Sequence, residues 1–318
     1  MNITMIEAAA ARLAGHARAT PLLNAPLLDA AFGKRVLIKA ECLQVTGSFK
    51  FRGAWSAVSA LPAGTRGVLA YSSGNHGQGV ALAAARHGLP CVVVMPSDAP
   101  QVKIANTRAY GAEVVLYDRR TEDRDALGAA LCAQRGLVLI KPFDDAQVIA
   151  GQGTVGLEIA AQALQAGVDS ADVLVCCGGG GLSAGIALAL EARAPGLRLR
   201  TVEPVGFDDM ARSLAAGERL RNPATTGSVC DAILTPSPGE LTFPVLQRLA
   251  GPGMVVSDDQ ALQAMALAFT HLRIVLEPGG AVALAAALFG ETPDPVICVA
   301  SGGNADPALF RDALARFG

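Results

Sequence analysis

The segment TGSFKFRGA, residues 46–54, sets Lys50 between Phe49 and Phe51 at the start of a predicted helix. Lysines in such places are usually solvated, but apolar neighbours that exclude water lower the pKa of the amine. A neutral lysine amine acts as a base or a nucleophile, and it forms a Schiff base with a carbonyl cofactor. This segment alone leaves open whether Lys50 is a solvated lysine or a catalytic one.

A glycine loop, CCGGGGLSAGIALAL at residues 176–190, follows a predicted strand and opens a predicted helix. It holds four consecutive glycines: Gly178, Gly179, Gly180 and Gly181. Glycines leave the backbone N–H groups unobstructed, and a helix N-terminus attracts an anion, so the loop predicts a phosphate site. Pyridoxal phosphate matches both features, because it offers an aldehyde to Lys50 and a phosphate to this loop.

The same glycine loop also fits a second interpretation. Gly179, Gly181 and Ala184 form a loose dinucleotide-binding pattern, and the acidic Glu203 ends the next predicted strand. An acidic residue at that distance binds the ribose of a nicotinamide cofactor. From the glycines alone, an NAD(P)-dependent oxidoreductase is therefore an alternative.

Two further polar loops follow predicted strands, SSGNHGQG at residues 72–79 and SGGNADP at residues 301–307. In the first loop, Ser72, Ser73 and Asn75 can cap a helix or bind a carboxylate together with the exposed amides. His76 is either a catalytic residue or a packed histidine. The second loop, which begins at Ser301, is either a simple turn or a hydrogen-bonding tip of the site.

The elements that must position these residues alternate between apolar β-branched runs and Ala-rich helical runs. Such alternation predicts βαβ units and a parallel sheet, in which ligands bind beyond the C-terminal ends of the strands. The three polar loops are therefore expected to meet at one site. One helix is predicted over residues 121–136, with Thr121 as its cap, and residues 206–253 are expected to be irregular.

Length and composition restrict the possible classes of protein. The 318 residues predict two domains or one large α/β unit. A net charge of −2 without a basic block argues against nucleic-acid binding, and no apolar run of membrane-spanning length occurs. The N-terminus does not resemble a signal peptide, and seven cysteines without metal-site spacing favour a reducing cytoplasm.

Seven segments occur in an order that makes the resemblance to a known family close. They resemble the threonine/serine dehydratase and serine racemase group of fold-type II pyridoxal-phosphate enzymes. The resemblance implies an α/β enzyme of the tryptophan synthase β-like type. It implies a large cofactor-binding domain over residues 1–51 and 143–318, and a small substrate-binding domain over residues 52–142. The segments are TGSFKFRGA, SSGNHGQG, FDDAQVIAGQGTVGLEI, GGGGLSAGIA, VEPVGFDDM, EPGGAVALAA and SGGN.

The resemblance also implies a role for each matching residue. Lys50 would bind the aldehyde of pyridoxal phosphate covalently, Phe49 would pack on the cofactor ring, and Asn75 would bond its phenolic oxygen. Ser301 would meet the ring nitrogen. A hydroxyl there does not force a protonated pyridinium, which favours β-elimination over transamination. The phosphate would lie on Gly178, Gly179, Gly180, Gly181 and Leu182, and the substrate carboxylate on Ser72, Ser73, Gly74, Asn75 and His76.

The reaction implied is loss of water from serine or threonine, which gives a 2-oxo acid and ammonia. Two outcomes on the same scaffold stay open. Ser73 matches a serine that opposes the lysine in racemases of this group, so serine or aspartate racemisation is an alternative. Arg124 matches a position that binds a distal acidic group in some relatives, and 3-hydroxyaspartate is then a candidate substrate. A small amino acid and a second copy of the chain, in a homodimer, are the expected partners.

The segment VEPVGFDDM carries a metal prediction. Related enzymes bind Mg²⁺ or Ca²⁺ through positions that match Glu203, the carbonyl of Phe207, and Asp209. Two carboxylates and a carbonyl suit such a hard cation. A solvated acidic turn is the other interpretation. The chain departs from its relatives at Ala232, where they often carry glycine beside the cofactor ring. The resemblance therefore does not determine the shape of the pocket there.

Overall fold

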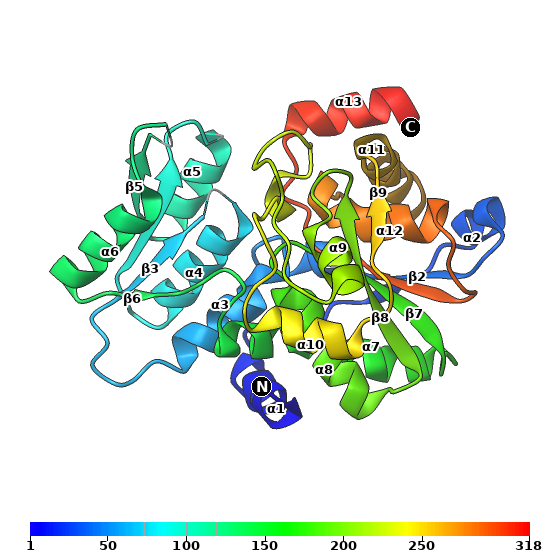
Figure 1. The fold of residues 1–318 in the computed structure, drawn as a ribbon, viewed down its shortest axis with the longest axis horizontal. Helices are drawn as coiled ribbons and strands as arrows, with labels where there is room; N and C mark the ends of the chain where they lie inside the picture. The colour runs from blue at the N-terminus through cyan, green and yellow to red at the C-terminus, as the bar shows by residue number, and fades with distance from the viewer. Residues whose placement is uncertain (73, 100, 119) are drawn as a thin grey trace.

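The protein folds into two lobes, each built on its own sheet with helices on both faces (Figure 1). The structure, a computed structural model, describes residues 1–72, 74–99, 101–118 and 120–318. The alternation of apolar strands and Ala-rich helices predicted parallel sheets, and both sheets are parallel except for one edge strand. The domain bounds 1–51 with 143–318, and 52–142, stay a prediction.

The larger sheet has six strands in the order β1-β2-β10-β7-β8-β9. Its central strands are buried on both faces, which is why their sequences read as continuous apolar runs rather than alternating ones. Only β1 at the edge is antiparallel to its neighbour. The strands are β1 (Leu22–Leu23), β2 (Val36–Lys39), β7 (Ala171–Cys176), β8 (Leu197–Pro204), β9 (Met254–Val256) and β10 (Val296–Val299).

Helix α12 lies on one face of this sheet with α11 and α13 outside it, and α7 and α8 cover the other (Figure 1). Glycines let α7 and α8 approach closely, because a Cβ on Gly185 would lie 2.4 Å from the Ile149 carbonyl oxygen. The helices of this lobe are α1 (Ile3–Leu13), α2 (Pro26–Phe32), α7 (Ala146–Gln165), α8 (Gly181–Arg193), α9 (Asp209–Ala216), α10 (Thr242–Leu249), α11 (Asp258–Leu267), α12 (Pro278–Phe289) and α13 (Pro307–Phe317).

The smaller sheet, on the left in Figure 1, has four parallel strands in the order β5-β4-β3-β6. Alternate residues of β3 and β4 face two separate apolar cores, one beneath α3, α4 and α5 and the other beneath α6. Its strands are β3 (Val68–Tyr71), β4 (Cys91–Pro96), β5 (Glu113–Tyr117) and β6 (Val138–Leu139). The helices are α3 (Lys50–Ser59), α4 (Asn75–Arg86), α5 (Gln101–Ala109) and α6 (Arg124–Arg135).

Two details differ from the sequence prediction. Helix α6 begins at Arg124 and is capped by Asp123, whose carboxylate accepts the N–H groups of Asp125 and Ala126, so the prediction of Thr121 as the cap is wrong. Residues 206–253 are not irregular throughout, since they contain α9 and α10. No helix in the described ranges is both long and apolar enough to cross a bilayer.

Candidate active site

One cavity of about 350 Å³ brings together the residues that the sequence singled out. The predicted Ser73 lies outside the described residues. All the other predicted cofactor and substrate residues line this cavity: Phe49, Lys50, Ser72, Gly74, Asn75, His76, Gly178, Gly179, Gly180, Gly181, Leu182 and Ser301. Their individual roles stay predictions.

Three of these residues lie just beyond the C-terminal ends of strands. Ser72 follows β3, Gly178 follows β7 and Ser301 follows β10. Strands β7 and β10 are parallel neighbours, so the loops that follow them lie side by side. The N-termini of α4 and α8 also open on the cavity, where their free N–H groups favour an anion.

Lys50 is the first residue of α3 and directs its amine into the cavity wall. Its Nζ donates a hydrogen bond to the Pro142 carbonyl oxygen at 2.9 Å and lies 5.2 Å from the centre of the Phe49 ring. Removal of water lowers the pKa of Lys50 to about 8. Much more of the amine is therefore neutral at physiological pH than in an ordinary lysine, which suits a nucleophile or base.

The tetraglycine loop is shaped so that side chains are excluded from it. Gly180 has a φ of 90°, in the left-handed region, and a Cβ on Gly179 would lie 2.2 Å from the Phe143 ring. The carbonyl oxygen of Gly179 accepts a hydrogen bond from the Thr242 hydroxyl at 2.6 Å, which fixes the loop. A fixed loop of exposed amides at a helix N-terminus fits a phosphate group.

Ser301 has a partner that the sequence did not predict. Its hydroxyl accepts a hydrogen bond from the Cys176 thiol at 3.1 Å. Burial raises the pKa of Cys176 to about 11, so the thiol stays protonated and remains a donor. The hydrogen of the Ser301 hydroxyl is then free for another acceptor, such as the nitrogen of a bound cofactor ring.

Asn75 is held by two further residues that sequence reasoning missed. The amide nitrogen of Asn75 donates to Glu277 at 2.5 Å, and its amide oxygen accepts from Asn304 at 2.7 Å. One amide hydrogen of Asn75 stays available, as the predicted bond to a cofactor oxygen requires. Glu277 opens the segment EPGGAVALAA, but nothing in the sequence indicated that it faces this loop.

Glu277 predicts a pH dependence of stability. Burial, partly offset by the Asn75 hydrogen bond, raises its pKa from 4.5 to about 7. The stabilisation that belongs to its neutral form is complete below pH 4.5 and is lost as the pH rises through about 7. When urea unfolding is measured at pH 5 and at pH 7.5, the free energy of unfolding should therefore fall less between the two pH values in Glu277→Gln than in the wild type. Glu240→Gln, an exposed control, should match the wild type; equal losses in all three proteins would refute the assignment.

His76 is packed rather than poised for proton transfer. Its Nε2 lies 2.9 Å from the Ile140 carbonyl oxygen, so this nitrogen carries the hydrogen. Burial and the neighbouring Lys50 lower the pKa of His76 to about 3, which keeps the ring neutral. Its Nδ1 has no hydrogen-bond partner among the described residues and can accept one from a ligand.

The predicted metal residues lie outside this cavity. Glu203 accepts the backbone N–H groups of Met210 and Ala211, at 2.9 and 2.7 Å, and so caps α9. One oxygen of Asp209 accepts from Asn222 at 2.6 Å, and the other has no partner among the described residues. Burial raises the pKa of Glu203 well above its usual value and that of Asp209 to about 6. Two buried carboxylates with an unpaired oxygen fit a divalent cation.

The position of Glu203 also bears on the nicotinamide interpretation. That interpretation needs Glu203 to face a ribose beside the glycine loop. The carboxylate instead caps α9, and it is not among the described residues that line the cavity. The glycine loop therefore lacks the acidic partner of a dinucleotide site.

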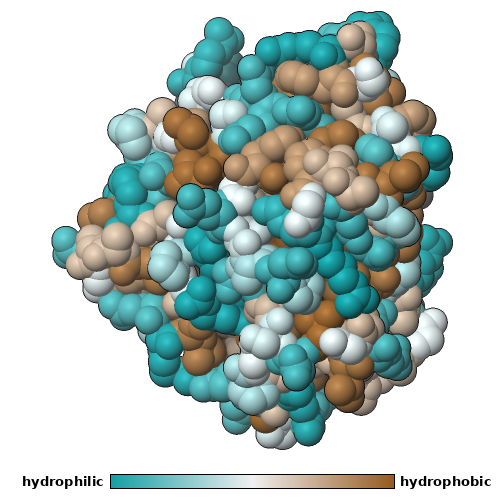
Figure 2. All heavy atoms as spheres, turned by 90° about the vertical axis from the view of Figure 1, so that its right-hand side faces the viewer, coloured by the Kyte–Doolittle hydropathy of each residue, from teal (hydrophilic) through white to brown (hydrophobic). Residues whose placement is uncertain are grey.

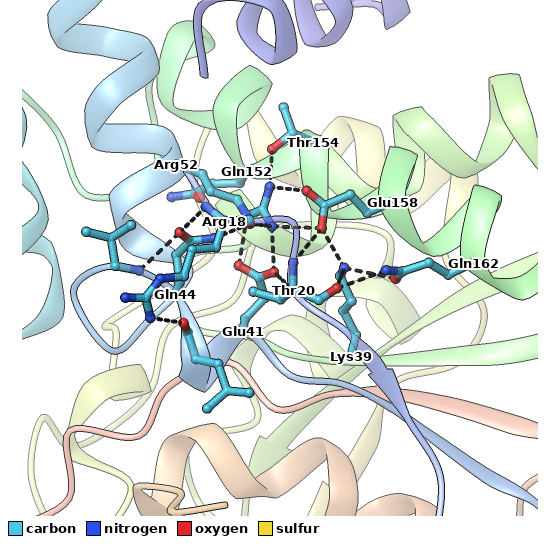
Figure 3. Close-up of polar contacts among 12 residues, drawn as sticks. Arg18, Thr20, Lys39, Glu41, Gln44, Arg52, Gln152, Thr154, Glu158 and Gln162 are labelled. Carbon is cyan, nitrogen blue, oxygen red and sulfur yellow. Dashed lines mark hydrogen bonds and ion pairs between the residues drawn. The ribbon is translucent and has the colours of Figure 1, made fainter. Parts of the chain in front are cut away.

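A buried charge network holds the helix that begins at Lys50 (Figure 3). Arg52 donates to both oxygens of Glu41, at 2.8 Å each, and to both oxygens of Glu158, at 2.7 and 2.9 Å. Lys39 donates to Glu158 at 2.5 Å. The network joins β2, α3 and α7, so it ties the start of α3 to the larger lobe.

Comparisons with known proteins agree with this geometry. The family model for pyridoxal-phosphate dependent enzymes matches residues 13–302. An L-threo-3-hydroxyaspartate ammonia-lyase from Pseudomonas sp is 44% identical, with 87% of this chain and 86% of the relative covered. A serine racemase from Oryza sativa subsp. indica is 36% identical, with 98% and 94% covered.

A solved structure also resembles the chain closely. The crystal structure of a threonine deaminase from T.th. superposes with a TM-score of 0.92 at 47% identity, covering 96% of this chain and 99% of that one. A family match over most of the chain, together with the lysine and the glycine loop in one cavity, excludes the nicotinamide alternative. The chain belongs to the pyridoxal-phosphate dependent enzymes and has their fold-type II α/β architecture.

Proposed function

We propose that this protein is an ammonia-lyase that removes water from a β-hydroxy amino acid, with threonine and serine as its first substrates. The observation that carries the proposal is the partly dehydrated Lys50 in the same cavity as the tetraglycine loop. The similarity to the threonine deaminase of known structure supports the choice of reaction.

The residues present divide the work between binding and proton transfer. Gly178 to Gly181 would hold the cofactor phosphate, and Ser301 and Asn75 would orient its ring. When bound, pyridoxal phosphate would supply an electron-withdrawing ring that makes the Cα proton more acidic. The amine of Lys50 would take the Cα proton, since a pKa of about 8 leaves much more of it neutral than in an ordinary lysine. The proton taken by Lys50 would then go to the β-hydroxyl, which departs as water, and a second water would hydrolyse the remaining unsaturated amine to ammonia and the 2-oxo acid.

The test is an assay of 2-oxo acid and ammonia from L-threonine and L-serine, with D-amino acid measured in the same samples. We expect equal amounts of 2-oxo acid and ammonia. Formation of D-serine without ammonia would overturn the lyase proposal in favour of the racemase alternative, which the similarity to serine racemases keeps in view. In that case Ser73→Ala should abolish racemisation if Ser73 is the second acid/base group.

We also propose that Mg²⁺ or Ca²⁺ binds Glu203, Asp209 and the carbonyl of Phe207. A cation would offset the repulsion between two buried carboxylates, which are otherwise unfavourable in their charged form. Chelation with EDTA should lower the melting temperature at pH 7.5, and Asp209→Asn should remove that effect. An unchanged melting temperature, with no metal found by elemental analysis, would contradict the site.

A homodimer in the cytoplasm completes the proposal. All seven cysteines are free, which fits a reducing compartment. The face in Figure 2 carries apolar patches among hydrophilic residues. Among the exposed apolar residues of the whole molecule, Leu27 and Leu164 are each 76% exposed. Light scattering of the purified protein at micromolar concentration gives the oligomeric state directly.

A further inference from the structure

Lys103 is a charged residue that the reaction described above does not use. It lies on α5 of the smaller lobe and lines the cavity that contains Lys50. Its side chain is only 12% exposed, although lysine is costly to bury. A Cβ on Gly74 would lie 3.9 Å from its Nζ, so the amine stands beside the loop predicted to bind the substrate.

The counter-ion of Lys103 is weakly held. Its Nζ donates to Asp231 at 3.1 Å, across from α5 to the opposite wall of the cavity. The Asp231 side chain is 59% exposed, so an incoming carboxylate can replace it while Asp231 returns to water. Lys103 thus provides a cation whose partner is readily exchanged.

Lys103 also stands where the cavity continues into a smaller hollow of about 110 Å³. Lys103, Asp231 and Glu277 line both spaces, whereas Lys50 and the glycine loop line only the larger one. Arg124 adds a second positive charge to the wall, with its guanidinium 5.1 Å from the Tyr71 ring centre. A serine or threonine side chain offers neither cation a negative charge.

We propose that Lys103 is a specificity-determining residue that binds the second carboxylate of a dicarboxylic β-hydroxy amino acid. The inference rests on the proposed lyase function and adds 3-hydroxyaspartate-like molecules as substrates that the enzyme prefers to threonine. The substrate displaces Asp231 from Lys103, and its α-carboxylate stays on the loop at the N-terminus of α4. Lys103 forms no covalent bond with the substrate; the two are held by an ion pair.

The test compares kcat/KM for L-threo-3-hydroxyaspartate and L-threonine in the wild type, Lys103→Met and the control Arg108→Met. Arg108 lies exposed on the same helix. Lys103→Met should lower the preference for hydroxyaspartate over threonine by about 100-fold, the order expected for a lost bond to a charged group. Arg108→Met should not alter it. Equal losses on both substrates would place Lys103 at the α-carboxylate and overturn the proposal.

A second variant tests the proposal even if Lys103→Met does not fold. A binding measurement tests it without turnover. Asp231→Asn removes the competing anion, so it should raise the preference for hydroxyaspartate. By calorimetry, the holoenzyme should bind succinate more tightly than propionate, and Asp231→Asn should widen that difference. A lower preference in Asp231→Asn, or equal affinity for the two acids, would refute the role of Lys103. Absence of turnover alone would count against the lyase function, since succinate binding needs none.

Discussion

Replacement of Lys50 by alanine is expected to lower kcat for β-elimination by at least about 10³-fold, because the variant loses both the cofactor anchor and the Cα base. Of the other described lysines, Lys103 also lines the cavity, but its amine pairs with Asp231. Lys141 is exposed beside Pro142. Steady-state assays with saturating pyridoxal phosphate measure the effect.

The matched control is Lys141→Ala, which removes an exposed lysine close in sequence to the acceptor of the Lys50 hydrogen bond. Its kcat should stay within about twofold of the wild type, as surface substitutions usually do little. If Lys50→Ala retained a tenth or more of the activity, the assignment of Lys50 would be wrong.

Replacement of Arg52 by methionine should lower the free energy of unfolding by about 3–5 kcal/mol, the usual cost of breaking a buried ion pair from one side. Arg52 is 2% exposed, and its removal leaves the buried Glu41 without its ion-pair partner and Glu158 with Lys39 alone. Although burial acts to raise it, Arg52 and Lys39 hold the pKa of Glu41 below its ordinary value. Urea unfolding at pH 7.5 measures the loss.

Arg248→Met provides the control for this prediction. Arg248 pairs with Glu191 on the surface, and both side chains are more than 40% exposed. Such a pair contributes about 0–1 kcal/mol. Similar losses in the two variants would show that the network in Figure 3 does not anchor the structure. Because Arg52 follows Lys50 by two residues on α3, Arg52→Met should also lower activity.

The sequence predicts the catalytic cavity better than the contacts that support it. Strand and helix periodicities were sufficient to place Ser72, Gly178 and Ser301 at strand ends, and the rules of parallel sheets then bring Gly178 and Ser301 together. Ser72 follows a strand of the other sheet, so its place beside them depends on how the two lobes pack. Side chains such as Arg52 and Glu277 carry no such signal. Their partners lie 106 and 202 residues away in the chain, and no periodicity encodes a contact of that range.

Helices α9 and α10 show a different limit. The segment between Gly206 and Gly253 is rich in Pro, Gly and polar residues, which usually indicate loops. Each helix is only eight residues long, below the length at which an isolated helix is stable. Helix α9 depends on Glu203 for its first N–H groups, and α10 packs against α8. Tertiary contacts therefore determine these helices more than local propensity does.

Covalent attachment of pyridoxal phosphate to Lys50 can be tested directly. The purified enzyme is loaded with the cofactor, reduced with borohydride and digested, and the peptides are weighed by mass spectrometry. We predict that the added cofactor mass lies on the peptide containing Lys50. An adduct on Lys103 or Lys141 instead, or no adduct at all after loading, would contradict the account.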